Sequence, residues 1–297
     1  MDTLVQDPGP EAGVRPPSPG KQRPDLITAG RERLTLIERA QIALIRQSFE
    51  PGPVDRALRS CQRHIGSTWI HHFNKHLRRV HGIERLPKLV ADQSFICVCN
   101  HRSFFDLYVV TAELVRRGMP QRLLFPVRAN FFYDHPLGFI VNGVMSFFAM
   151  YPPIFRERHK LALNVSSLDE LVWLLRRGGA FAGLHPEGTR NLSGDPYAFL
   201  PAQPGVGRVI HEAGVPVLPV FINGLINRLH RQVAGNFDGT GAPIIVVFGK
   251  PVDFGDLAKQ RGSPRVHRAV AERALQAIAE LGREEKLLRQ ELDRPSD

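Results

Sequence analysis

The sequence has little cysteine, few aromatic residues and no uncharged hydrophobic run long enough to read plainly as a membrane span. Its three cysteines, Cys61, Cys97 and Cys99, are too few for a disulfide framework, and the latter two fit a buried strand. Aromatic residues make up 8% of the chain, and no basic-aromatic strand pattern is present, so we expect no nucleic-acid partner. The first 30 residues lack the apolar segment of a signal peptide. These absences make a cytoplasmic location the default expectation.

The nearest approach to a membrane span is the stretch of residues 137–155, which carries no charge. Polar residues and a proline pair at 152 and 153 interrupt it, and a transmembrane helix needs about 20 mostly apolar residues. We expect this stretch to be buried core or a wall that faces substrate. The alternative is a segment that dips into the bilayer.

Several signatures of known chemistry are missing as well. The chain has no G-x-S-x-G nucleophile turn, no phosphate-binding G-x-x-x-x-G-K loop and no complete dinucleotide-binding pattern. No cysteine and histidine pattern has zinc spacing, and the pair His72 and His76 supplies too few ligands for a metal site. We therefore predict neither a metal nor a tightly bound cofactor.

What the sequence does contain is enough apolar residue for a large core and a strong excess of positive charge. Hydrophobic residues make up 43% of 297 residues, and the formal net charge is +10, which favours anionic partners. We predict a disordered tail over residues 1–30, a two-helix N-terminal motif over 31–81 and an α/β domain over 82–297.

The N-terminal motif combines an apolar stripe with a cationic side. Apolar residues recur at helical spacing over 33–49, and a second helical pattern over 54–80 has strongly basic polar positions. Helices that lie on a lipid surface have this character, so we predict a membrane-binding hairpin. In the alternative interpretation, the two helices present an ordinary solvated face and pack on the domain.

From residue 94 onward, short apolar runs alternate with helical patterns. Ser167 and Glu170 fit a capping box at the start of one of these helices. This alternation predicts an α/β fold with a mostly parallel central sheet covered by helices. The expected strands are 94–99, 122–127, 180–184, 217–222 and 244–249, and the expected helices are 104–117, 168–177, 206–213 and 263–292.

Two polar segments each follow a predicted strand, where ligands bind in open α/β sheets. The first reads N-H-R-S-F-F-D over residues 100–106. If His101 lies in the loop and Asp106 in the first helical turn, the carboxylate can accept from one imidazole nitrogen while the other takes a proton from a hydroxyl. Alternatively, Asp106 caps the helix with Ser103, and His101 is an ordinary loop residue.

The second segment reads H-P-E-G-T-R over residues 185–190. Gly188 permits close backbone approach, and Arg190 offers a planar guanidinium suited to a phosphate. Glu187 could accept a hydrogen bond from a polyol hydroxyl. Taken alone, the segment can also be a turn with a surface charge pair.

Together the two segments resemble the glycerolipid acyltransferase family, whose type members are the 1-acylglycerol-3-phosphate acyltransferases. The first matches the family's N-H-x-x-x-x-D block, and residues 186–190 match its P-E-G-T-R block at a typical separation. The V-P-V-L-P-V of residues 215–220 is similar to a later proline-containing block, and Phe155-Arg156 stands for a weaker second block. The resemblance covers about residues 80–250, and the N-terminal helices are similar in placement to a membrane-binding element of some members.

The resemblance implies that His101 is a general base and Asp106 its orienting partner. His185 departs from the phenylalanine that the family often has there, which leaves the packing around the acceptor open. Arg190 is implied to hold a phosphate, with Arg156 as a second candidate. The implied substrate-binding residues are Arg156, Glu187, Gly188, Thr189 and Arg190.

The implied activity is O-acyl transfer from acyl-CoA or acyl-carrier protein to a hydroxyl of a lysophospholipid or glycerol-phosphate acceptor, with 1-acylglycerol-3-phosphate as the family's commonest. The acyl chain needs an apolar groove, for which residues 137–155 with Phe131 and Phe132 are best supplied. We expect a peripheral association with an anionic membrane surface. A thioester hydrolase with the same His and Asp, and a non-catalytic basic membrane-surface adaptor, are the alternatives.

Overall fold

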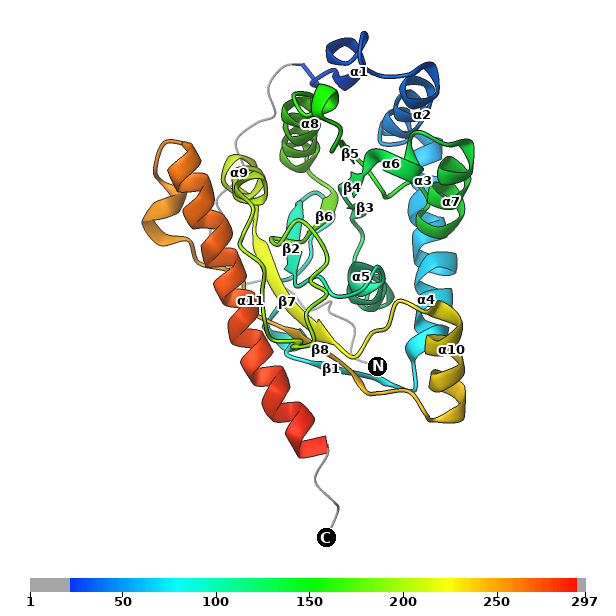
Figure 1. Ribbon diagram of the computed structural model, residues 1–297, viewed down its shortest axis with the longest axis vertical. Helices are drawn as coiled ribbons and strands as arrows, with labels where there is room; N and C mark the ends of the chain where they lie inside the picture. Colours follow the sequence, from blue (N-terminus) through cyan, green and yellow to red (C-terminus); the bar gives the residue numbers. More distant parts are fainter. Residues whose placement is uncertain (1–21, 293–297) are drawn as a thin grey trace.

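The core of the protein is a six-stranded sheet in the order β1-β8-β7-β2-β6-β3 (Figure 1). The computed structural model describes residues 22–292. Neighbouring strands are parallel except β7 and β8, which are antiparallel. The predicted α/β fold with a mostly parallel sheet is therefore confirmed. The strands are β1 (Arg78–His81), β2 (Phe95–Cys99), β3 (Arg122–Leu124), β6 (Ala180–Leu184), β7 (Val217–Asn223) and β8 (Ile244–Phe248).

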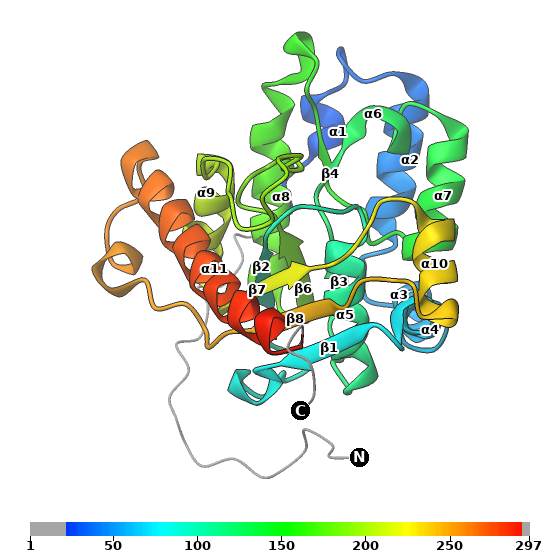
Figure 2. The ribbon, with the colours of Figure 1, turned by 60° about the horizontal axis from the view of Figure 1, so that its bottom comes forward.

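Helices cover both faces of this sheet (Figures 1 and 2). One face carries α8 (Leu163–Arg177), α9 (Pro204–Ala213) and α11 (Pro264–Leu292), and the other carries α5 (Asp106–Arg116) backed by α4 (Ser67–Asn74). Every residue of β2 and β8 is buried, as expected for strands covered on both sides. The packing is close: a Cβ on Gly207 of α9 would lie 1.7 Å from the carbonyl oxygen of His267 on α11.

The N-terminal motif is joined to the main sheet. It contains α2 (Leu36–Gln47), α3 (Pro53–Cys61), a π-helical segment (Gln62–Gly66) and α4. The second predicted helix ends before residue 80, because residues 78–81 form the edge strand β1, which pairs in parallel with β8. The membrane-binding role of the motif stays a prediction.

Smaller elements connect β3 with α8. The strand predicted over 122–127 is divided into β3 and β4 (Val127–Arg128). β4 pairs with β5 (Pro153–Ile154). Between β4 and β5 in the chain lie α6 (Ala129–Phe132) and α7 (Pro136–Ser146). The expectation of a buried or substrate-facing stretch over 137–155 holds in its last third, but α7 turns Leu137, Ile140 and Val144 outward, each more than half exposed. A further helix, α10 (Leu229–Asp238), follows β7. Across residues 22–292, no helix combines the length and apolar character needed to cross a bilayer.

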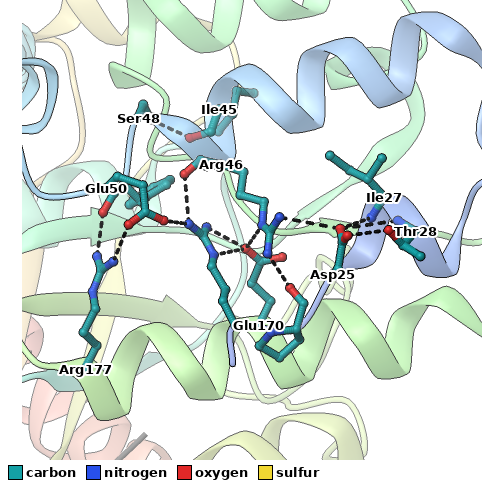
Figure 3. Close-up of polar contacts among 12 residues, drawn as sticks. Asp25, Ile27, Thr28, Ile45, Arg46, Ser48, Glu50, Glu170 and Arg177 are labelled. Atoms are coloured by element: carbon teal, nitrogen blue, oxygen red, sulfur yellow. Dashed lines mark hydrogen bonds and ion pairs between the residues drawn. The ribbon is translucent and has the colours of Figure 1, made fainter. Parts of the chain in front are cut away.

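The described part of the predicted disordered tail is folded, and residues 1–21 lie outside the described residues. Asp25 caps α1 (Leu26–Ala29) by accepting from the backbone N–H groups of Ile27 and Thr28, and Leu26 is fully buried (Figure 3). The predicted tail is therefore wrong for residues 22–30, because apolar burial and capping hold them on the domain.

The same segment is tied down by a buried carboxylate, Glu170 (Figure 3). Arg23 Nε donates to Glu170 Oε1 at 2.7 Å, and Arg46 Nε donates to the same oxygen at 3.1 Å. The predicted capping box at Ser167 and Glu170 is wrong: α8 begins at Leu163, so both residues lie inside the helix. The side chain of Glu170 serves the two arginines instead of the helix terminus.

Candidate active site

The first polar segment leaves the sheet at the carboxyl end of β2, next to β7. Asn100 is 1% exposed, and its side-chain amide makes the two hydrogen bonds that the backbone of a paired strand residue would make. Its Nδ2 donates to the carbonyl oxygen of Ile222, and the N–H of Ile222 donates to its Oδ1, both at 2.8 Å. These bonds continue the pairing of β2 with β7 by one step and fix where the chain turns away.

Asp106 collects three donors at the start of α5. Its Oδ2 accepts from the N–H groups of Arg102 and Ser103 at 2.8 Å each, and from His101 Nδ1 at 3.3 Å. Asp106 therefore contacts the imidazole, as the first interpretation proposed, and also accepts from the backbone of the turn before the helix. The alternative of a helix cap at Ser103 is wrong, because α5 begins at Asp106 with Phe105 as its N-cap and without a side-chain cap bond. The predicted placement, with His101 in the loop and Asp106 in the first turn, is confirmed.

Burial separates the protonation behaviour of the two groups. It raises the pKa of Asp106 to about 6, and burial followed by the positive charge of Arg190 lowers the pKa of His101 to about 4. At neutral pH the pair is thus a carboxylate beside a neutral imidazole. Because the carboxylate can only accept, the imidazole proton lies on Nδ1 and Nε2 keeps a lone pair. The imidazole side chain is 20% exposed, against 1% for the carboxylate.

His185 lies against this pair. Its ring stacks on that of His101, with the centroids 3.8 Å apart and the planes 10° from parallel. Among the described residues, His101, Asp106 and His185 also form the group whose nitrogen and oxygen atoms come within 4.8 Å of one another, as metal ligands do. A shared ion would have to lie in both ring planes at about 2.1 Å from each nitrogen. Nearly parallel planes cannot meet in this way, so the arrangement does not fit a metal.

Glu187 clamps the two polar segments together. It is 1% exposed, and its oxygens accept the N–H of His101 at 2.9 Å and the N–H of Leu200 at 2.8 Å. The N–H of Asn191 donates to the carbonyl oxygen of His101 at 2.8 Å. The predicted use of this carboxylate as a ligand for the acceptor stays a prediction, and the bonds in place give it a structural task.

The two predicted phosphate ligands lie at the outer side of the second segment. Arg190 Nη1 donates to Asn227 Oδ1 at 3.1 Å, and Arg156 Nη2 donates to the carbonyl oxygen of Gly188 at 2.9 Å. Gly188 has φ +66°, which favours glycine, and Gly188, Thr189 and Arg190 are exposed. The structure thus brings Arg156 to the segment that contains Arg190.

Asn227 is a residue that the sequence interpretation missed. Its Oδ1 accepts from Arg190 and from the N–H of Phe104 at 3.0 Å, and its Nδ2 donates to the carbonyl oxygen of Arg102 at 3.4 Å. It therefore fixes Arg190 against the loop of His101. No local signal marks it, because it follows β7 in a loop without a recognisable motif.

A cavity of about 420 Å³ adjoins the pair at the carboxyl ends of β2 and β7. Asp106 and Arg102 line it, together with residues 191–194, Pro196, the end of β7 and the loop that follows it as far as Ile226. His101 and Arg190 are not among its lining residues, although Asn191 next to Arg190 and Ile226 next to Asn227 are. Residues 137–155 do not line it either; Met145 to Phe147 line a separate, smaller cavity, and the side chain of Phe131 lies outside the described residues.

Comparison with known proteins gives three kinds of match. Residues 77–223 match the family model described as Acyltransferase. A probable 1-acyl-sn-glycerol-3-phosphate acyltransferase of Mycoplasma genitalium is 25% identical over 178 residues, covering 57% of this chain and 62% of that protein. A chloroplastic 1-acyl-sn-glycerol-3-phosphate acyltransferase of Brassica napus is 27% identical over 174 residues, covering 57% and 44%. The chain thus spans less than two thirds of the length of these relatives.

Among solved structures, the 1-acyl-sn-glycerophosphate (LPA) acyltransferase PlsC of Thermotoga maritima is similar, with a TM-score of 0.50 and 23% identity. The match covers 86% of this chain and 90% of that one. At this identity the likeness concerns the fold.

Proposed function

The chain belongs to the acyltransferase family, and from that premise we propose that it moves a fatty acyl group from acyl-CoA or acyl-carrier protein to a hydroxyl of a lysophospholipid or glycerol-phosphate acceptor. The first choice of acceptor is 1-acylglycerol-3-phosphate, which the names of both curated relatives contain. The observation that carries the proposal is the contact between His101 Nδ1 and Asp106 Oδ2 at 3.3 Å.

In this mechanism, the Nε2 lone pair of His101 takes the proton of the acceptor hydroxyl as the hydroxyl oxygen attacks the thioester carbonyl. The tetrahedral intermediate then expels the thiolate by breaking the carbon–sulfur bond, and His101 returns the proton to the sulfur. The products are an ester and a free thiol. Asp106 holds the Nδ1 tautomer and stabilises the imidazolium that forms between the two proton transfers.

The acceptor's phosphate is proposed to bind near Arg190 and Arg156. Guanidinium groups suit phosphate oxygens because they offer parallel N–H donors. Arg156 Nη2 contacts the carbonyl oxygen of Gly188, two residues from Arg190, which supports a shared phosphate position. Thr189, the exposed residue between Gly188 and Arg190 in the chain, is proposed to contact the same acceptor.

Association with the membrane is proposed to use the side of the molecule formed by α2 and α7, here called the apolar flank. Both helices lie near α3 in both ribbon views (Figures 1 and 2). The basic residues Arg56 and Arg63 are exposed nearby in the chain, and they complement anionic lipid. The flank is defined by exposed side chains of α2 and α7: Leu36, Ile37, Leu44, Leu137, Ile140 and Val144.

Vesicle sedimentation tests this surface. The double variant Ile140→Glu/Val144→Glu should lose binding to vesicles containing anionic phospholipid. The matched control is Leu287→Glu/Leu292→Glu, which places the same two negative charges at exposed apolar residues of α11, on another side of the molecule. Equal binding of both variants would remove α7 from the proposed surface.

The activity itself is tested with one labelled acyl-CoA and a panel of lysolipid and glycerol-phosphate acceptors, read by mass spectrometry. Acyl transfer that depends on the acceptor supports the proposal. Free fatty acid formed at the same rate with and without acceptor would identify a hydrolase instead. Membrane binding without any turnover, unchanged in His101→Ala, would identify an adaptor.

A further inference from the structure

His185 is held at the catalytic pair by the sheet itself. It is the first residue after β6, and the register of β2 with β6 places Val98 opposite Leu184, so His185 follows on beside Cys99. Its Nδ1 lies 2.9 Å from the carbonyl oxygen of Cys99. A carbonyl oxygen can only accept, so Nδ1 carries the proton and the neutral ring has one defined tautomer.

This tether aligns the ring with that of His101. The two rings lie 3.8 Å apart and within 10° of parallel, so one face of the His101 imidazole is covered by a flat neighbour whose own orientation is fixed. Asp106 engages the edge of His101 at Nδ1. The contact with Asp106 limits sliding of the His101 imidazole in its plane, and the stacking with His185 limits tilting out of that plane.

We propose that His185 is a positioning residue for His101, which holds the plane of the imidazole and shields its covered face from water. The proposal rests on the proposed function only in taking His101 as the base. With Nδ1 donating to the carbonyl oxygen of Cys99, His185 contacts His101 through the face of its ring, and this contact defines its task. Burial also lowers the pKa of His185 to about 3, which keeps the ring neutral while the enzyme works.

The charged and titratable groups around His101 come from two elements. Asp106 contacts it from α5, and Arg190 acts on it from the loop after β6. Glu187 accepts its backbone N–H. Burial is the first cause of the lowered pKa of His101, with Arg190 second. Removing the ring that covers one face should therefore let water in and raise that pKa toward its usual value.

Two substitutions distinguish the effect of the stacked ring of His185 from the effect of its hydrogen bond to Cys99. His185→Phe keeps an aromatic plane but lacks the N–H that donates to Cys99, so kcat should stay within about threefold of the wild type. His185→Ala removes the plane, and loss of a stacked pair should lower kcat about tenfold. Neither variant should change the KM of donor or acceptor, because His185 contacts His101 and not a predicted substrate ligand.

The deciding measurement is nuclear magnetic resonance of the full chain with nitrogen-15-labelled histidine, with the His101 signals assigned from His101→Ala. In the wild type and His185→Phe, His101 should keep its proton on Nδ1 and titrate within about half a pH unit of each other. In His185→Ala, its titration midpoint should rise by more than about one pH unit, while Asp106 still keeps the proton on Nδ1.

An unchanged titration midpoint and an unchanged kcat in His185→Ala would overturn the proposal. If His185→Ala does not fold, His185→Leu replaces it, since leucine fills the volume without a flat ring and should still lower kcat. The spectra need no substrate. A wild-type protein without acyl transfer but with the expected spectra would thus sink the proposed function and leave this inference standing.

Discussion

Replacing Glu187 by glutamine distinguishes a carboxylate that builds the site from one that binds the acceptor. Glu187 is 1% exposed, and its two oxygens serve the backbone N–H groups of His101 and Leu200. Glutamine keeps one oxygen and turns an NH₂ group toward the other N–H, so one buried donor loses its acceptor. Such a loss costs about 1–3 kcal/mol, and bonds to a charged acceptor are worth about 1.5–3 kcal/mol. We expect the free energy of unfolding to fall by about 2–3 kcal/mol.

Urea unfolding measures this change, provided that the wild type and the variant unfold with the same slope. Hydrogen exchange gives a local measurement: the amide of His101 or of Leu200 should exchange faster. Because His101 is then held less firmly, kcat should fall while the KM of the acceptor stays nearly constant. The control Glu291→Gln, at an exposed position of α11, should change none of these quantities. Unchanged unfolding and exchange, together with a raised acceptor KM, would refute the reasoning and make Glu187 a ligand.

Three further outcomes are expected. His101→Ala should lower kcat by about 10²–10⁴-fold with an unchanged circular dichroism spectrum, since this is the usual worth of a general base; activity within tenfold of the wild type would contradict that task. The kcat/KM should fall as the pH drops below about 6, because the raised pKa of Asp106 means that the carboxylate needed to orient the imidazole is protonated there. A flat profile between pH 5 and 7 would contradict this. Arg190→Ala should raise the KM of the acceptor, whereas Arg158→Ala, which removes an exposed arginine two residues after Arg156, should not; an equal KM in both variants would remove Arg190 from the phosphate site.

The parts of the site that the sequence predicted well are those set by local geometry. His101 and Asp106 lie between the end of one strand and the start of the next helix, so a few residues determine their contact. The strands β2, β6 and β8 were recognisable for a similar reason: each is a short, continuous apolar run, which is typical of strands buried on both faces.

The parts that it did not predict depend on contacts between distant segments. Glu170 fits a helix start by its spacing from Ser167, but its carboxylate instead accepts from Arg23 and Arg46, which lie more than 120 residues away in the chain. Glu187 similarly meets the N–H of His101, 86 residues earlier. Asn227 carries no pattern at all, because its importance comes from the two loops that it touches.

The paired arginines around Glu170 also set a limit on how the N-terminus can be shortened. A protein that started after Asp25 would lack Arg23, and of the cations in residues 22–292 that pair with Glu170, Arg46 would remain on a carboxylate with no exposed surface. A buried charge left with no partner costs about 3–5 kcal/mol, a large part of the stability of most domains, and Arg46 offsets part of that cost here. Expression boundaries and affinity tags are therefore best placed ahead of residue 22, where they leave this anchor whole.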